Sequence, residues 1–148
     1  MQDTLPIHFA PLQGYTEAIY RNAHDAFFGG VDTYYTPFVR LEKGNFRRRD
    51  VRGIEPENNG VTHLIPQLIA SSAEKAEVIL SLFIEKGYQE VDINLGCPFP
   101  LLAKRHNGSG ILPYPEEVKA LLSIVTRYPQ ISFSVKMRLG WEQPDECL

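Results

Sequence analysis

Cys97 is the residue whose type and position most directly suggest chemistry in this sequence. It follows a short apolar run in VDINLGCP (91–98), and a proline fixes the chain directly after it. A cysteine thiol is mostly protonated at neutral pH, so it can donate a proton. The alternative is that Cys97 is a small buried apolar residue, which is the commoner role of a free cysteine.

Other apolar segments also end in a tight proline–glycine turn or in polar side chains. These residues are Pro11, Leu12, Gln13 and Gly14 after 7–10, Gln67 in 63–69, Asn94 beside Cys97, and Lys136 and Arg138 in 131–139. In parallel α/β proteins, sites form beyond the carboxyl ends of the strands, so these residues would converge on one opening.

Each of these residues also has a structural interpretation. Gln67 could satisfy backbone groups, and Asn94 could cap a turn. Lys136 is harder to explain in this way, because a lysine inside an apolar strand needs a carboxylate or a bound anion to offset its desolvation. The convergence of the set therefore carries more weight than any single member.

The elements that must position these residues alternate along the chain. Strands are predicted at 7–10, 32–39, 63–69, 91–95 and 131–139, and helices at 17–28, from 71 to 87, and from 115 to 128. Thr16 is expected to cap the first helix, and Ser71 with Glu74 forms a Ser-x-x-Glu capping box at the second. Residues 40–62 are expected to be a long polar connection with at most one short helix.

This alternation predicts an α/β fold with a parallel sheet and right-handed crossovers. Either a barrel or a doubly wound sheet satisfies it. A dinucleotide-binding Rossmann fold loses its main support, because no Gly-x-Gly-x-x-Gly follows the first strand. The loop 97–114 contains Gly108 and Gly110, which would let its backbone close over a substrate without Cβ clashes.

Composition narrows the class of protein. The chain has 148 residues, 43% hydrophobic and 22% charged, with a net charge of −3, which fits one globular domain and excludes a general polyanion binder. Cys97 and Cys147 have neither zinc nor disulfide-framework spacing, so no metal is expected. No signal peptide and no membrane span is visible, so a cytoplasmic setting is the expectation.

Positive charge is concentrated after the second predicted strand. Six basic residues lie within thirteen positions: Arg40, Lys43, Arg47, Arg48, Arg49 and Arg52. They could bind RNA phosphates. A solvated basic loop is the alternative.

Five stretches together resemble one family. They are APLQGYTEAIYR (10–21), PQLIAS (66–71), VDINLGCPFP (91–100), KRHNGSGILP (104–113) and FSVKMRLGW (133–141). In this order, they resemble the N-terminal part of the tRNA-dihydrouridine synthases, which are FMN-dependent enzymes on a TIM barrel. The resemblance covers nearly the whole chain, and its motifs are specific only in combination.

The resemblance implies a role for each candidate residue. Pro11, Leu12 and Gln13 would line the flavin, Gln67 would hydrogen-bond its ring, and Lys136 would lie at its N1/O2 edge. Asn94, and with it Arg138, would contact the substrate, and Cys97 would be the proton donor. Leu12 departs from the methionine usual at its position, with little consequence expected because both side chains are apolar and unbranched at Cβ.

The implied reaction is the reduction of the uridine C5=C6 bond in tRNA, with NADPH as the reductant. Hydride would reach C6 from the reduced flavin, and a proton would reach C5 from Cys97. The base must leave its stack to react, and Tyr15 or Phe99 could stack on it, although both could equally be packing residues.

Two alternatives remain at this point. Another flavin barrel that acts on a pyrimidine, such as a dihydroorotate dehydrogenase, carries a similar Asn-x-x-Cys-Pro turn. A non-catalytic RNA-binding remnant would depend on the basic residues 40–52 instead.

The chain is also expected to be incomplete. A TIM barrel has eight strands and about 250 residues, and only the first five strands are predicted here. The remaining barrel strands and a helical domain would be absent, so this chain alone is expected to bind FMN poorly and to be inactive. Open sheet edges would favour self-association.

Overall fold

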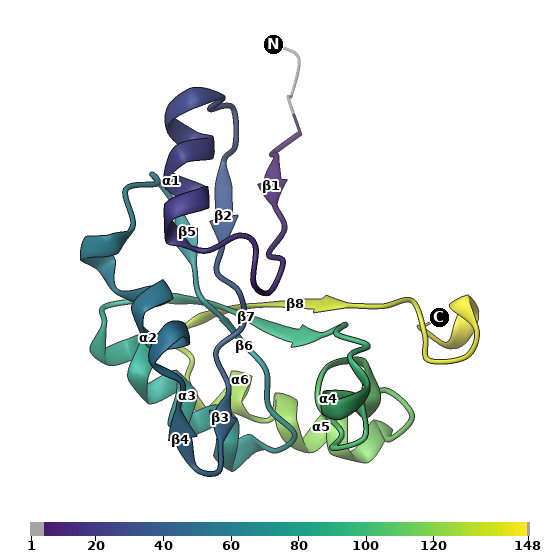
Figure 1. Cartoon of the computed structure of the whole chain (residues 1–148). Coiled ribbons are helices and arrows are strands. Elements are labelled where there is room, and N and C mark those ends of the chain that lie inside the picture. The colour runs from purple at the N-terminus through teal and green to yellow at the C-terminus, as the bar shows by residue number, and fades with distance from the viewer. Residues whose placement is uncertain (1–4, 148) are drawn as a thin grey trace.

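The protein, described by a computed structural model over residues 5–147, is a mixed α/β chain with two parallel sheets (Figure 1). The first sheet contains β1 (His8–Phe9), β2 (Thr33–Tyr35) and β5 (Leu64–Ile65) in that order. The second contains β6 (Gln67–Leu68), β7 (Glu90–Leu95) and β8 (Ser132–Met137). Every neighbouring pair within these sheets is parallel, which confirms the predicted parallel α/β class.

The five predicted strands do not form one continuous sheet. Pro66 separates β5 from β6, and the single bridge between Val39 and Leu68 continues the pairing from the β2 segment. Because proline has no backbone N–H, it interrupts a ladder. The hydroxyl of Thr36 fills part of this gap by accepting the Gln67 N–H at 3.0 Å, and the Pro66 carbonyl accepts the Asp92 N–H at 3.0 Å.

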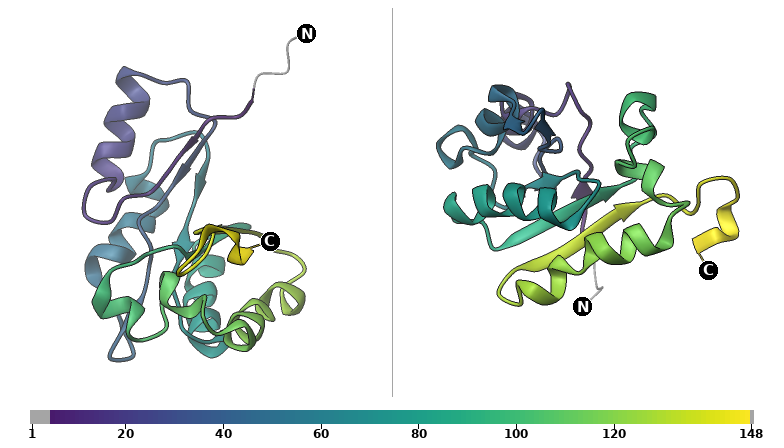
Figure 2. Two further views of the ribbon diagram at one scale, coloured as in Figure 1. Left: turned by 90° about the vertical axis from the view of Figure 1, so that its right-hand side faces the viewer. Right: turned by 90° about the horizontal axis from the view of Figure 1, so that it is seen from below.

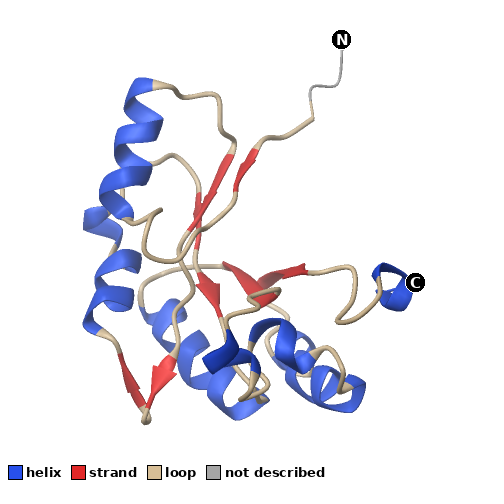
Figure 3. Ribbon diagram, turned by 45° about the vertical axis from the view of Figure 1, so that its right-hand side comes forward, coloured by secondary structure: helices blue, strands red, loops and turns tan. Residues whose placement is uncertain are grey.

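Helices cover one side of the strands. They are α1 (Ala18–Phe27), α2 (Arg48–Ile54), α3 (Ala73–Glu85), α4 (Pro100–Ala103), α5 (Pro115–Leu122) and α6 (Ile124–Arg127), with 3₁₀ turns η1 (Pro56–Asn58), η2 (Gly108–Ile111) and η3 (Pro144–Cys147). Figure 3 shows the opposite side of the strands without helical cover in the part of the chain that is described. That uncovered side is where the strands can present polar groups.

The main core lies between α3, α5 and α6 and the second sheet. Ala76, Ile79 and Phe83 of α3 pack against Leu68 of β6 and Ile93 of β7 in one cluster. Figure 2 shows α3 and α5 running alongside β7 and β8. This core fixes β7, whose last residue stands two positions before Cys97.

Both predicted helix caps need correction. The N-cap of α3 is Ser72, whose hydroxyl accepts the Lys75 N–H at 3.5 Å, whereas Ser71 accepts the Lys75 ammonium group at 2.7 Å. The capping box at Ser71 was therefore misplaced by one residue. The N-cap of α1 is Glu17, and the Thr16 hydroxyl instead accepts the Leu12 N–H at 2.9 Å. In both cases the predicted cap residue accepts a hydrogen bond from a different nearby donor: Ser71 from the Lys75 ammonium group and Thr16 from the Leu12 N–H.

The connection 40–62 has more structure than predicted. It contains the antiparallel hairpin of β3 (Leu41–Glu42) and β4 (Asn45–Phe46), then α2 and η1. Ile54 at the end of α2 is buried in the main core, which explains why this segment folds onto the domain. Within residues 5–147, no helix is both long and apolar enough to cross a membrane.

Candidate active site

A row of hydrogen-bonded polar side chains crosses the uncovered face of the second sheet. Gln67, Asp92 and Ser134 are register partners on β6, β7 and β8. The Asp92 carboxylate accepts hydrogen bonds from Gln67 Nε2 at 2.6 Å and from Ser134 Oγ at 2.7 Å. Asp92 is only 3% exposed, and this burial raises the pKa of its carboxyl group, an effect that the two hydrogen bonds and nearby Lys136 oppose.

Asn94 links this row to the cysteine turn. Its Nδ2 donates to Gln67 Oε1 at 2.8 Å, and its Oδ1 accepts the backbone N–H groups of Gly96 and Cys97, each at 3.0 Å. Asn94 therefore caps the turn, as the structural interpretation proposed. The same side chain connects the turn to the buried row, so Cys97 is held by a chain of hydrogen bonds that begins at Asp92.

The loop after Cys97 is locked against it from the other side. The Cys97 carbonyl accepts the Ser109 N–H at 3.0 Å and the Ser109 hydroxyl at 3.1 Å. Gly108 has φ +60°, and a Cβ there would lie 2.6 Å from the Cys97 carbonyl oxygen. A Cβ on Gly110 would lie 2.2 Å from the Ala103 carbonyl oxygen.

These two glycines therefore have a different role from the one expected. The space that their missing side chains leave is filled by Cys97 and Ala103 of the same chain, not kept open for a substrate. The positive φ of Gly108, and the absence of a side chain at both glycines, allow the loop to pack tightly against the cysteine turn.

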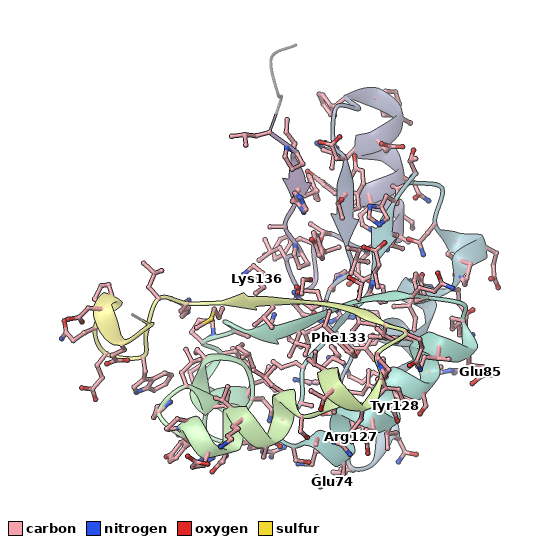
Figure 4. All side chains as sticks on the ribbon, turned by 180° about the vertical axis from the view of Figure 1, so that it is seen from behind. Glu74, Glu85, Arg127, Tyr128, Phe133 and Lys136 are labelled. Atoms are coloured by element: carbon pink, nitrogen blue, oxygen red, sulfur yellow. The ribbon has the colours of Figure 1, made fainter. Side chains whose placement is uncertain are left out.

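Lys136 lies on β8 with Ser134, and Arg138 directly follows the end of that strand. Lys136 is the register partner of Asn94 and is exposed, so the expectation that it is desolvated within an apolar strand is wrong. Figure 4 shows it on the side of β8 that faces away from α5 and α6. Arg138 Nε donates to the Gly96 carbonyl at 2.9 Å, which ties the end of this strand to the cysteine turn.

The turn after β1 forms a separate part of the candidate site. Leu12 is exposed, and its backbone N–H is bonded to Thr16. Both amide atoms of Gln13 are buried without a hydrogen-bond partner among the described residues. The structure thus joins Gln67, Asn94 and Cys97 by hydrogen bonds. Arg138 is tied to the same turn through the Gly96 carbonyl, and Lys136 is in register with Asn94. No hydrogen bond links the 11–13 turn to these residues within the described chain.

Sequence reasoning missed the two residues that anchor the row, Asp92 and Ser134. Both stand two positions from a residue that was identified, Asn94 and Lys136 respectively, so period-two alternation could have shown that they share its face. Tyr35 was also missed. Its hydroxyl hydrogen-bonds His8 Nδ1 at 2.9 Å. The pKa of this hydroxyl is raised, mainly by burial and to a smaller extent by the charges of Asp92 and Glu90.

The described residues offer no group of three His, Cys, Asp or Glu side chains that could hold a metal ion. The site consists of the Cys97 thiol, the cations of Lys136 and Arg138, and amide and hydroxyl groups around the buried Asp92 carboxylate.

Comparison with known proteins shows which family the chain belongs to. The family model described as dihydrouridine synthase matches residues 8–148, which include every residue of the site. The chain belongs to the dihydrouridine synthase family. Within this family domain, Asn94, Cys97 and Lys136 all come from the carboxyl ends of β7 and β8 or the turn that follows.

Individual relatives carry the same family name. A probable tRNA-dihydrouridine synthase 1 of Synechocystis is 29% identical over 90% of this chain. A tRNA-dihydrouridine synthase B of Pasteurella multocida is 23% identical over 96%, and one of Klebsiella pneumoniae is 33% identical over 51%. The matched parts cover 37%, 42% and 24% of those relatives, so the chain spans less than half of their length.

Proposed function

We propose that this member of the dihydrouridine synthase family takes part in the FMN-dependent reduction of the uridine C5=C6 bond in tRNA, with NADPH as the reductant. The observation that carries the proposal is the hydrogen-bonded path from Asp92 through Gln67 and Asn94 to the Cys97 turn. It holds the backbone of Cys97 just beyond the carboxyl end of a buried strand, beside the face that helices leave uncovered. The names of the relatives support the choice of tRNA. With a tRNA substrate, we propose a cytoplasmic setting for the activity.

For the fold, we propose that the two parallel sheets are consecutive strands of a TIM barrel whose inward face carries the polar row. The helices lie on the outer side, as a barrel requires. On this proposal, residues 1–148 contribute the part of a catalytic domain that surrounds Cys97. The outer edges of β1 and β8 have no partner strand among the described residues, so they could also pair with a second copy of the chain.

The residues present fit a flavin. The Gln13 amide is buried and has no hydrogen-bond partner within residues 5–147, and it follows the Pro11–Leu12 backbone in the turn after β1. Gln67 uses only one hydrogen-bonding position on each amide atom within the described chain, so it retains one N–H and one lone pair for a ring edge. Lys136 supplies a cation on the same face as Asn94.

In the proposed reaction, two hydrogens are added to the pyrimidine ring. When bound and reduced, the flavin would supply a hydride to C6. Cys97 would donate the proton to C5, which completes the saturation of the double bond and leaves a thiolate that must be reprotonated before the next turnover. Lys136 would stabilise negative charge at the electron-rich edge of the flavin ring.

Substrate positioning is assigned to Asn94 and Arg138. Asn94 retains one Nδ2–H after bonding Gln67, and this group could donate to a uracil carbonyl. Arg138 holds the Gly96 carbonyl through Nε, so a contact between its guanidinium and RNA would act directly on the cysteine turn.

A genetic experiment tests the proposal with the protein at its natural length. The gene is deleted in the source organism, and dihydrouridine in purified tRNA is measured by mass spectrometry. We expect at least one dihydrouridine position to revert to uridine, and the unaltered gene to restore it. Dihydrouridine that is unchanged at every position after deletion would refute the proposed activity.

A further inference from the structure

A basic pocket lies just outside the cysteine turn. It has a volume of about 440 Å³ and is lined by the β3–β4 hairpin, the first half of α3 and the segment 99–107. We call it the rim pocket and define it by Arg40, Lys43, Lys75, Phe99, Leu101 and Arg105. Among the described residues that line it, four side chains are cationic and one, Glu42, is a carboxylate.

The positive charge of the rim pocket is poorly neutralised within the chain. Arg40 Nη2 lies 3.8 Å from Glu42 Oε1, which is too far for a hydrogen bond, and Arg40 Nε is buried without a partner in residues 5–147. Among the residues that the structure describes, the Lys75 ammonium group hydrogen-bonds only the neutral Ser71 hydroxyl, at 2.7 Å. A buried guanidinium N–H without a partner carries a desolvation cost that a bound anion would remove.

Other basic residues nearby are neutralised or lie elsewhere. Arg47 donates two hydrogen bonds to the buried Asp50 carboxylate, at 2.7 and 2.8 Å. Arg48 and Arg52 line a different surface hollow on α2, together with Glu55. The basic stretch 40–52 is therefore not one patch, and its first two cations face a different site from the rest.

The rim pocket adjoins the proposed site of chemistry. Leu102 lines the pocket and also belongs to a small buried cluster with Phe38 and Ile69, against which Cys97 packs. Phe99 lies two residues after Cys97 and is 53% exposed on the pocket rim. Cys97 thus packs against a buried cluster that also contributes residues to the pocket wall.

We propose that the rim pocket binds a backbone phosphate of the substrate RNA, adjacent to the nucleotide that is presented to Cys97. This inference rests on the proposed function. Arginine forms paired hydrogen bonds with phosphate, and the unpartnered Arg40 Nε–H is already desolvated for such a contact. Exposed Phe99 and Leu101 add an apolar surface for a base or ribose, the combination that single-stranded RNA sites use and that a free phosphate ion does not need.

Binding of a fluorescein-labelled single-stranded oligouridylate of twelve nucleotides to the 148-residue chain tests the inference by anisotropy, without flavin or turnover. The variant Arg40→Gln/Arg105→Gln should bind at least tenfold more weakly than the unaltered chain. The slope of log K against log salt should fall by about 0.7, the value for one phosphate on a single strand. The matched control Arg48→Gln/Arg52→Gln removes the same charge from α2 and should stay within about twofold.

Equal weakening by the two double variants would overturn the inference, because binding would then follow total charge. So would displacement of the RNA by micromolar NADPH at constant ionic strength, which would assign the pocket to a nucleotide cofactor. Circular dichroism of each variant, followed through thermal unfolding, identifies loss of fold. If the pocket variant unfolds, Arg40→Lys, which keeps the charge but cannot form paired hydrogen bonds, must still weaken binding, or the inference is wrong. Loss of this binding difference leaves the tRNA dihydrouridine measurement unaffected, so the two proposals fail separately.

Discussion

The buried carboxylate of Asp92 accepts a hydrogen bond from Gln67 at 2.6 Å, and this contact sets the direction of the Gln67 amide. Because Nε2 is turned toward Asp92, Oε1 is turned toward Asn94, whose own oxygen then faces the N–H groups of the Cys97 turn. Asp92 has no proposed contact with the flavin or the substrate, but it orients Gln67, Asn94 and the Cys97 turn, which do.

Replacement of Asp92 by asparagine should lower the stability of the fold. An amide at position 92 replaces one of the two acceptor oxygens with an NH2 donor group, so its two atoms cannot accept from Gln67 and Ser134 as the two carboxylate oxygens do. The expected loss is about 1–3 kcal/mol in the free energy of unfolding, measured with urea. The control Asp145→Asn, at an exposed position, should change stability by less than about 0.5 kcal/mol. An Asp92→Asn variant of unchanged stability would show that the row does not need two acceptor oxygens at position 92.

The same carboxylate should make stability depend on pH in a definite direction. Burial raises the pKa of Asp92 above its ordinary value of 3.8, so the folded state binds this proton more tightly than the unfolded state. Its contribution is fully present below pH 3.8 and is lost as pH rises through the higher folded pKa. The unfolding free energy of the unaltered chain minus that of Asp92→Asn should therefore fall as pH rises from 3.5 to 7. A difference that rises with pH would contradict the assigned direction.

Gly108→Ala should disturb the cysteine turn more than its backbone angle alone explains. The positive φ costs an alanine about 1–2 kcal/mol, and the added Cβ would also press on the Cys97 backbone at 2.6 Å. Gly87 has φ +87° with open space around it, so Gly87→Ala separates the two effects. We expect a larger loss of urea stability for Gly108→Ala. Equal losses would mean that the loop can yield and that close packing against Cys97 is unimportant.

The 148-residue chain should bind FMN weakly. The described strands form two three-stranded parallel sheets that do not enclose the polar face, and the chain matches less than half of the length of the relatives named above. A fluorescence titration should give no stoichiometric binding at micromolar concentrations, and Gln13→Ala should weaken whatever binding remains. Tight one-to-one binding by the unaltered chain would contradict this.

The main features of the fold were predictable because local patterns and burial agree there. The apolar face of α3 and the continuous apolar run of β7 both follow from spacing, and both lie in the main core. The predicted helix caps at Ser71 and Thr16 were wrong because neighbouring side chains can take the N-cap position equally well, and tertiary packing decides which of them does. The hairpin and α2 within 40–62 were missed because their stability depends on the burial of Ile54 in a distant cluster.

For the site, the residues themselves could be predicted from the sequence, but the hydrogen bonds between them could not. Asn94 and Cys97 are neighbours in the chain, so their turn could be inferred. The dependence of that turn on Asp92, Gln67 and Ser134 requires the register of three strands that are far apart in sequence. The division of the basic stretch 40–52 likewise depends on where the hairpin places Arg40 and Lys43.

The most direct test of the central claim is the mass-spectrometric measurement of dihydrouridine in tRNA from the deletion strain after complementation with the Cys97→Ala gene. Cys97→Ala removes the proposed proton donor and leaves intact the backbone N–H and carbonyl groups through which Asn94 and Ser109 hold the turn. We predict that the variant protein accumulates to normal levels and leaves the affected uridine unreduced. Dihydrouridine restored to the level of the unaltered gene would contradict the assignment of the proton to Cys97.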